Sequence, residues 1–279
     1  MCLELSQNTK KQQRNRPFIK ITMIEELINS FNLFHFAVIC TAFFLGGLVK
    51  GTSSFGLPTV SVPILITVLP LPAALSVLAV PLVLSNLFQM ISAGGIKHAV
   101  KRHWSLYVTV LATLPVGVYL LAIADVNLLT VVLGIVLMIV TSFEIFGIPL
   151  TFLKNHEKFY APIIGILSGI IGGMTSLFAI LPIFFMVALG LEKERFVSAV
   201  SVMLCTGSLV LAISLQRTDN LGSLEVVYGV LGMLPIISGI WLGTQLRKKV
   251  DQMIFRKIVL SLIFIIGISM VVRSYDVFL

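Results

Sequence analysis

Residues 47–56, which read GLVKGTSSFG, have a counterpart 122 positions later in residues 169–178, which read GIIGGMTSLF. Both stretches interrupt a long apolar run with small and hydroxyl-bearing residues, and both precede a proline, Pro63 in the first copy and Pro182 in the second. Paired interruptions at matching places in two halves are typical of secondary transporters, whose discontinuous helices form a substrate site near the bilayer midplane. The duplication therefore indicates a transporter.

The composition indicates a membrane protein. The 279-residue chain is 57% hydrophobic and 11% charged, with a mean hydropathy of +1.05, whereas a soluble domain carries roughly a quarter charged residues. Its charges lie in short clusters between apolar runs of about 17 to 25 residues, the length that crosses a bilayer as a helix. A membrane barrel would instead alternate apolar and polar residues. We therefore expect an all-α, polytopic helical protein in the cell membrane, with the lipid bilayer around it.

The net charge of +8 does not point to nucleic acid. The basic residues gather in short loops, one holding Lys97, Lys101 and Arg102 and another within residues 247–257, where such residues fix the orientation of membrane spans. The three cysteines are widely spaced, and the four histidines lack ligand spacing with any cysteine or carboxylate. We expect no nucleic-acid partner, metal or other cofactor, and no feature indicates an oligomeric state.

Ten hydrophobic segments, five in each half, follow an N-terminal region. We expect a basic extension with a short interfacial helix over residues 1–33, one transmembrane repeat over 34–153 and a second over 154–279. The segments are 34–50, 55–69, 72–91, 104–124, 127–152, 160–172, 176–189, 195–215, 224–246 and 254–273.

An odd number of crossings turns the second repeat upside down and gives an inverted repeat. Residues 113–117 (TLPVG) and 232–236 (GMLPI) extend the match between the halves. With both termini outside, the loops with the most lysine and arginine fall inside and the Asp125 turn falls outside, as the positive-inside rule requires. An alternative treats the first two segments as one broken crossing.

The interruptions supply the backbone of a candidate anion site. Gly51 permits a turn, and a helix that restarts after Ser53 and Ser54 would offer free N–H groups and a positive dipole end to an anion. Thr175 and Ser176 repeat this arrangement in the second half, although such hydroxyls often bond only their own backbone. For four other glycines we expect close helix packing instead: Gly46, Gly47, Gly165 and Gly169.

Lys50 adds a positive charge beside the first interruption. A lysine inside a membrane segment is costly and by default marks function. The alternative is that its side chain reaches from a helix end to the interface. We favour function because Gly51 and the hydroxyl run adjoin Lys50 directly.

Other polar residues lie on later segments. Asn86 and Gln89 are one helical turn apart and so face the same side; they would either donate to an oxyanion or join helices to one another. Residues 205–208 (CTGS) occupy the matching place in the second half. Glu144 is either a proton carrier or, as we favour, an interfacial group near Lys154.

These features resemble the sulfite exporter TauE/SafE family over about residues 35–273. The resemblance rests on the duplicated interruption, the proline after it, the stretch 81–89 (PLVLSNLFQ) and the closing 239–243 (GIWLG). It implies an anion permease of the bacterial inner membrane that moves sulfite, sulfoacetate or related sulfur compounds, with a glycine-rich break in each half. The chain departs from the pattern at Lys50, where a small residue is usual, and in its second break, which has few glycines.

The sequence thus predicts a secondary transporter that moves a small anion, such as sulfite or an organosulfonate, by alternating access. An anion channel and an intramembrane enzyme are the alternatives; the segments hold no paired carboxylates, no histidine pair and no supported serine nucleophile. The predicted substrate-binding residues are Lys50, Gly51, Ser53, Ser54, Asn86, Gln89, Thr175 and Ser176.

Overall fold

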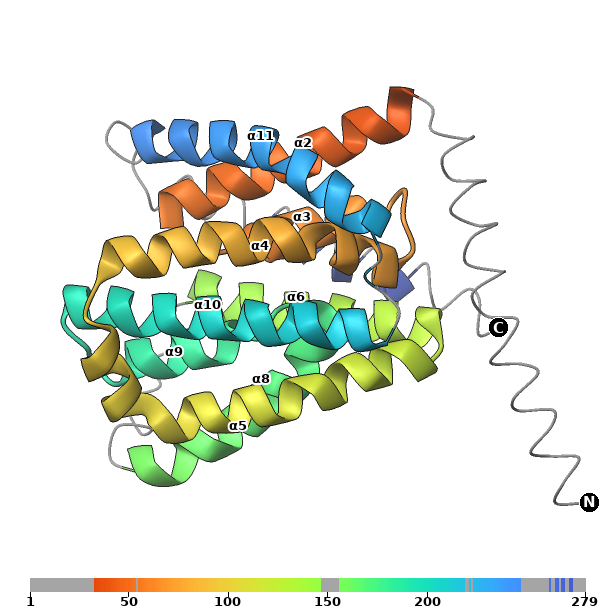
Figure 1. Ribbon diagram of the computed structural model, residues 1–279. Coiled ribbons are helices and arrows are strands. Elements are labelled where there is room, and N and C mark those ends of the chain that lie inside the picture. Colours follow the sequence, from red (N-terminus) through yellow and green to blue (C-terminus); the bar gives the residue numbers. More distant parts are fainter. Residues whose placement is uncertain are drawn as a thin grey trace, which may run out of the picture. The chain divides into compact units, whose positions relative to one another are not determined.

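The computed structural model describes residues 33–53, 55–146, 156–218, 221, 223–246, 261, 264–265, 267–268 and 271–272. The chain divides into two compact units, Met1–Ile39 and Cys40–Leu279, and the contacts given below lie within the second. Across the described residues every regular element is a helix, which confirms the all-α prediction (Figure 1). The helices are α2 (Leu33–Ser53), α3 (Leu57–Leu65), α4 (Leu71–Ala93), α5 (Ile96–Ile123), α6 (Val126–Phe146), α8 (Glu157–Thr175), α9 (Ile180–Ala188), α10 (Lys193–Arg217) and α11 (Ser223–Leu246).

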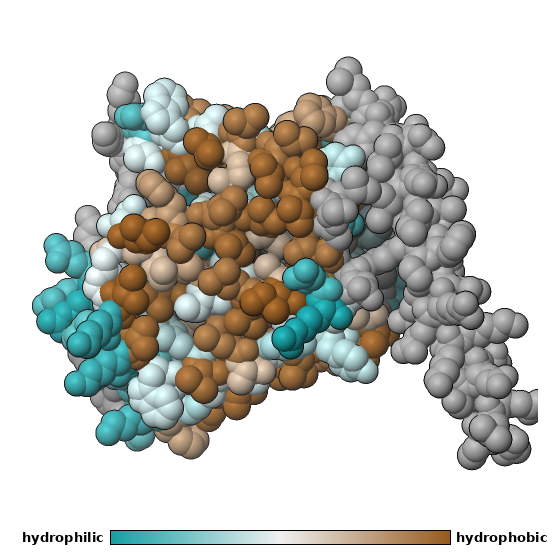
Figure 2. Space-filling model, viewed as in Figure 1, coloured by the Kyte–Doolittle hydropathy of each residue, from teal (hydrophilic) through white to brown (hydrophobic). Residues whose placement is uncertain are grey.

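Six of these helices are long and apolar enough to cross a membrane: α2, α4, α5, α8, α10 and α11. A helix satisfies its backbone hydrogen bonds within one segment, as the bilayer interior demands. Large apolar side chains such as Tyr119, Leu234 and Trp241 are exposed, and apolar residues cover much of the face that Figure 2 shows. Because water would not favour such a surface, the protein is a multi-pass membrane protein.

Two expected segments contain only short helices. The helices α3 and α9 have nine residues each, and nine residues extend about 14 Å, too little to cross a bilayer. Both follow an interruption at which a residue adopts positive φ, 95° at Gly56 and 63° at Ser176. The segment expected at 254–273 lies mostly outside the described residues, so the count of ten and the repeat boundaries remain predictions.

The helix α3 folds back along α2. The hydroxyl of Ser61 in α3 donates to the Ala42 carbonyl in α2 at 2.9 Å, and a methyl group at Gly46 would lie 2.9 Å from the carbonyl oxygen of Leu57. Later residues of α3 therefore meet earlier residues of α2. The two helices form a hairpin, which does not match the alternative of one broken crossing.

Glycines let four helices approach as two close pairs. A methyl group at Gly47 would lie 2.4 Å from the Ile236 carbonyl oxygen of α11, and one at Gly169 would lie 2.6 Å from the Val110 carbonyl oxygen of α5. No substituent fits at such distances, so both glycines serve helix packing as expected. Gly51 does the same against Ile240, at 2.3 Å. The expected turn at Gly51 is therefore wrong: α2 runs through it to Ser53.

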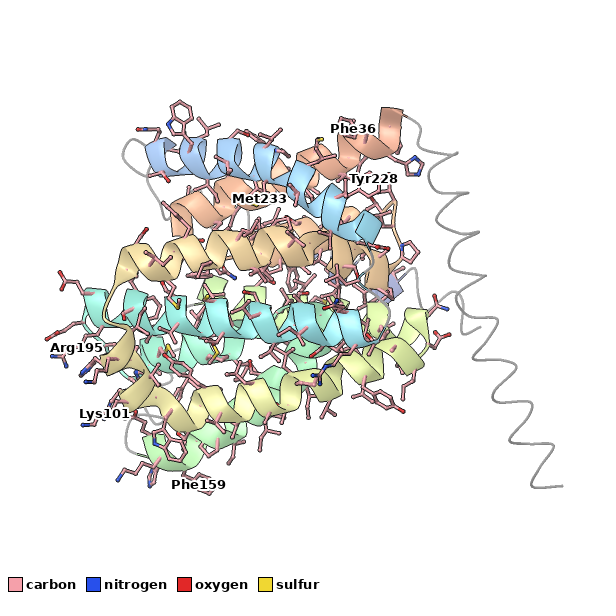
Figure 3. All side chains as sticks on the ribbon, viewed as in Figure 1. Phe36, Lys101, Phe159, Arg195, Tyr228 and Met233 are labelled. Carbon is pink, nitrogen blue, oxygen red and sulfur yellow. The ribbon has the colours of Figure 1, made fainter. Side chains whose placement is uncertain are left out.

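The polar connections gather at one end of the helices. The Arg102 guanidinium of α5 pairs with the Glu157 carboxylate of α8 at 2.6 Å, and Ser198 of α10 donates to the Gly94 carbonyl after α4 at 2.7 Å. Figure 2 shows hydrophilic residues at this end, and Figure 3 places Lys101 and Arg195 there. The loops predicted to share one side of the membrane thus lie together among the described residues.

The arrangement predicts the orientation of the chain. A reporter fused after Lys101 should be cytoplasmic because that loop carries the basic cluster, and one fused after Lys249 should be cytoplasmic as well. A reporter near Asp125, at the far end of α5, should be external. Two reporter enzymes, one active only in the cytoplasm and one active only outside it, measure on which side each fusion point lies. An external Lys249 fusion would contradict the five-crossing scheme.

Candidate functional site

The candidate site centres on Lys50, in the last turn of α2. Its side chain is only 6% exposed. The amino group Nζ donates to Ser85 Oγ of α4 at 2.9 Å and to Asn86 Oδ1 of the same helix. A lysine that reached for the membrane surface would point away from the neighbouring helices. The inward hydrogen bonds therefore favour the functional interpretation of Lys50 over the interfacial one.

Asn86 extends this cluster to the second half of the chain. Its amide Nδ2 donates to the Leu204 carbonyl of α10 at 3.1 Å, and one turn later Gln89 Nε2 donates to Ser201 Oγ at 3.3 Å. Both amides thus face α10, as their spacing predicted. Each joins helices, and the Asn86 oxygen in addition accepts from Lys50. The point where α2, α4 and α10 meet is the polar centre of the site.

No acidic side chain compensates Lys50 among the described residues. The ion pairs in that part of the chain involve Glu157 and Glu192, which lie at or next to the starts of α8 and α10. Ser85 lies eight residues before the end of α4 at Ala93, or about 12 Å along the helix. A buried cation with only neutral partners is costly. The charged form of Lys50 is therefore favoured when an anion is bound beside it.

The hydroxyls of the interruptions bond their own backbone. Ser53 Oγ lies 2.8 Å from the Val49 carbonyl oxygen and 2.6 Å from that of Phe55, and Thr175 Oγ1 donates to the Ile171 carbonyl at 2.7 Å. These side chains shape the ends of α2 and α8 in the way that hydroxyls often do in helices. No recorded contact brings them to Lys50. Ser54 lies outside the described residues.

Ser176 differs from these hydroxyls. It is the one non-glycine residue with positive φ in the described part of the chain, and its backbone N–H caps α8 by donating to the Gly172 carbonyl at 2.7 Å. Its hydroxyl is buried, with no hydrogen-bond partner among the described residues. A left-handed conformation and an unsatisfied buried hydroxyl each cost about 1–2 kcal/mol or more. Ser176 is therefore a candidate ligand group.

The second half closes the position that corresponds to Lys50. Gly172 and Gly207 lie 122 positions after Lys50 and Ser85. Phe178 fills the space beside them, with its backbone and Cβ at Gly172 and its ring at Gly207. A methyl group at Gly172 would lie 2.2 Å from Phe178 Cα, and one at Gly207 would lie 2.3 Å from its Cε2. The sequence analysis did not predict that Phe178 fills this space. This position is therefore polar in the first half and filled by an aromatic residue in the second.

Ser85 is the other residue that sequence reasoning did not select for the site. It directly precedes Asn86, and its hydroxyl both accepts from Lys50 and lies 3.3 Å from the Leu82 carbonyl oxygen. Adjacent positions on a helix point about 100° apart, so their common contact depends on a side chain that reaches between them. The long lysine provides that reach.

Glu144 lies in α6, where its side chain is outside the described part of the structure. Both interpretations of this carboxylate remain predictions. No group of three or more histidine, cysteine or acidic residues able to hold a metal occurs among the described residues.

The chain matches the model of one protein family. The family model of the sulfite exporter TauE/SafE matches residues 39–270, which includes Lys50, both interruptions and all the polar residues of α4 and α10 described above. No curated protein and no solved structure matches the chain.

Replacement of Ser176 by glycine separates a ligand role from a structural one. Glycine adopts positive φ without strain, and the unsatisfied hydroxyl disappears. After the entropy cost of glycine is subtracted, Ser176→Gly should raise the stability of the folded protein by about 1–3 kcal/mol. If the hydroxyl contacts substrate, the same variant should bind anion more weakly. Thermal unfolding in detergent with and without sulfite measures both, with Ser238→Ala on α11 as the control. Lower stability together with unchanged binding would contradict the assignment.

Proposed function

Because the chain belongs to the sulfite exporter TauE/SafE family, we propose that it is a secondary transporter that moves a small anion across the bacterial inner membrane. Sulfite and organosulfonates are the anions we propose. Family membership and six apolar helices make the protein a multi-pass membrane protein of a transporter family. We propose the identity of the substrate and the transport mechanism on the observations that follow.

The buried amino group of Lys50 is the observation that carries the proposal, and the following argument concerns its protonated form. An ammonium has three N–H donors, and Ser85 and Asn86 accept from two of them. The third has no recorded acceptor among the described residues. An anion bound there would provide the missing countercharge and accept a charge-assisted hydrogen bond, which is stronger than one between neutral groups.

The helix contacts support an inverted repeat. In the predicted repeats α2 corresponds to α8, α4 to α10 and α5 to α11. Accordingly α2 packs on α11 as α8 packs on α5, and α4 packs on α10. The polar end lies at the end of α4 but at the start of α10, so corresponding helices run in opposite directions, as inversion requires.

The same arrangement supports alternating access, which we propose as the mechanism. Transporters with inverted repeats expose a central site to each side in turn by moving one repeat or bundle against the other. Here Lys50 and Asn86 belong to the first half and the Leu204 carbonyl belongs to the second. A movement between α4 and α10 would therefore change the hydrogen bonds of the site itself. An anion channel is the remaining alternative.

Substitution of Lys50 tests the proposed site. Lys50→Met should reduce anion affinity about tenfold or more, because a hydrogen bond to a charged group is worth about 1.5–3 kcal/mol. Lys50→Arg should retain part of the affinity, since the charge persists with a different geometry. Stabilisation of the purified protein by sulfite or methanesulfonate reports binding, and uptake of labelled sulfite into liposomes reports transport.

Lys101→Met is the matched control, because Lys101 is an exposed lysine at the polar end. It should bind and transport as the unaltered protein does. Normal transport by Lys50→Met at equal expression would sink the assignment of this residue. Flux that does not saturate with anion concentration would favour the channel.

A further inference from the structure

The surroundings of Lys50 hold almost no group that can titrate. Neither α3 nor α4 contains an acidic, basic, cysteine or tyrosine residue. On α11 the titratable residues are Glu225 and Tyr228, at least 12 positions before Ile240, which packs against Gly51. On α2 itself the nearest is Cys40. On α10 the titratable residue nearest to this point is Cys205, which directly follows Leu204, whose carbonyl accepts from Asn86.

This environment is unfavourable for a permanent cation. An isolated ammonium removed from water loses its hydration, and two neutral acceptors do not restore it. In such surroundings a lysine gives up its proton rather than keep an uncompensated charge. The membrane around the protein offers no countercharge at this depth.

The hydrogen bonds of Lys50 fit the neutral form. A neutral amine has two N–H donors and one lone pair, and the structure records two acceptors, Ser85 Oγ and Asn86 Oδ1. Both bonds therefore persist when the proton leaves. A third N–H appears only when the amine takes up a proton, and it then has an anion as its natural acceptor.

We propose that Lys50 is a neutral amine in the empty site and takes up one proton when the anion binds, so that the protein carries one anion together with one proton. This inference rests on the proposed function. The proton comes from the water on the side from which the anion enters and forms the ammonium on Nζ. On the other side the anion leaves, the ammonium returns its proton to water, and the neutral amine remains.

A pH gradient is the driving force expected for joint movement of an anion and a proton. An anion of charge −1 and one proton together carry no net charge, so their movement should respond to a pH gradient and not to the membrane potential. Anion binding should also weaken as the pH rises, because binding consumes a proton. The affinity should fall by up to about tenfold per pH unit once the empty site is mainly unprotonated.

Methanesulfonate is the suitable probe, because its own charge does not change in the range from about pH 6 to about pH 9. Purified full-length protein in weakly buffered detergent solution should take up one proton per methanesulfonate bound, seen as a rise in the pH of the solution. Affinity measured across the same range should fall with rising pH. Chloride-free liposomes should take up methanesulfonate with an inward proton gradient and show no response to an imposed potassium diffusion potential.

Three variants separate Lys50 from other proton sources. Lys50→Arg keeps its charge throughout this pH range and should bind with no proton uptake and with constant affinity. Cys205→Ser should retain the full uptake, which excludes transfer of a proton from the thiol to Lys50. Lys101→Gln, at the exposed polar end, is the control and should behave as the unaltered protein does.

The outcomes distinguish this inference from the function on which it rests. Methanesulfonate binding without proton uptake, at constant affinity, would overturn the inference and leave the anion site standing. Loss of the uptake in Cys205→Ser would assign the proton to the thiol and also overturn it. Absence of binding by both methanesulfonate and sulfite would overturn the anion site itself, and the inference with it.

Discussion

The hydrogen bonds from Lys50 to Ser85 and Asn86 join three helices through a charge that the bilayer disfavours. Asn86 passes the connection to α10 by donating to the Leu204 carbonyl. Removal of a membrane lysine by selection is easy, because leucine or methionine would fill the same space at lower cost. The buried amine at the junction of α2, α4 and α10 therefore has a cost that packing alone does not explain, and a function for it would offset that cost.

The two halves of the chain share a helix arrangement but differ in the residues at the position of Lys50. Close pairs of helices, α2 with α11 and α8 with α5, form through glycines in both halves. At the position that holds Lys50 in the first half, the second half has Gly172, closed by Phe178. A duplicated scaffold thus carries one polar centre, and the apolar counterpart supports packing.

Much of this architecture was predictable from the sequence, because long apolar runs and glycine spacing have direct structural consequences in a bilayer. The runs predicted the six long helices, and the burial cost of a lysine singled out Lys50. The one-turn spacing of Asn86 and Gln89 correctly predicted that both face one neighbour. That neighbour is α10, which the spacing alone does not identify.

The remainder depends on tertiary contacts that local patterns do not encode. Gly51 looked like a turn residue, yet the close approach of Ile240 explains its lack of a side chain. The hydroxyls of Ser53 and Thr175 donate to carbonyls one turn earlier in their own helices, and their predicted role as ligands stays a prediction. The same sequence pattern is compatible with a hydroxyl that bonds its own helix and with one that binds a ligand. Among the hydroxyls in the described part of the chain, that of Ser176 is the one that is buried and unsatisfied.

The central claim is that a substrate anion compensates Lys50. Selenite resembles sulfite in shape and charge, and selenium is located unambiguously by anomalous X-ray scattering. A crystal grown with selenite should show a selenium peak whose oxygens lie about 2.7–2.9 Å from Lys50 Nζ, the length of a charge-assisted hydrogen bond. A selenium peak elsewhere, with Lys50 bonded only to Ser85 and Asn86, would contradict the account.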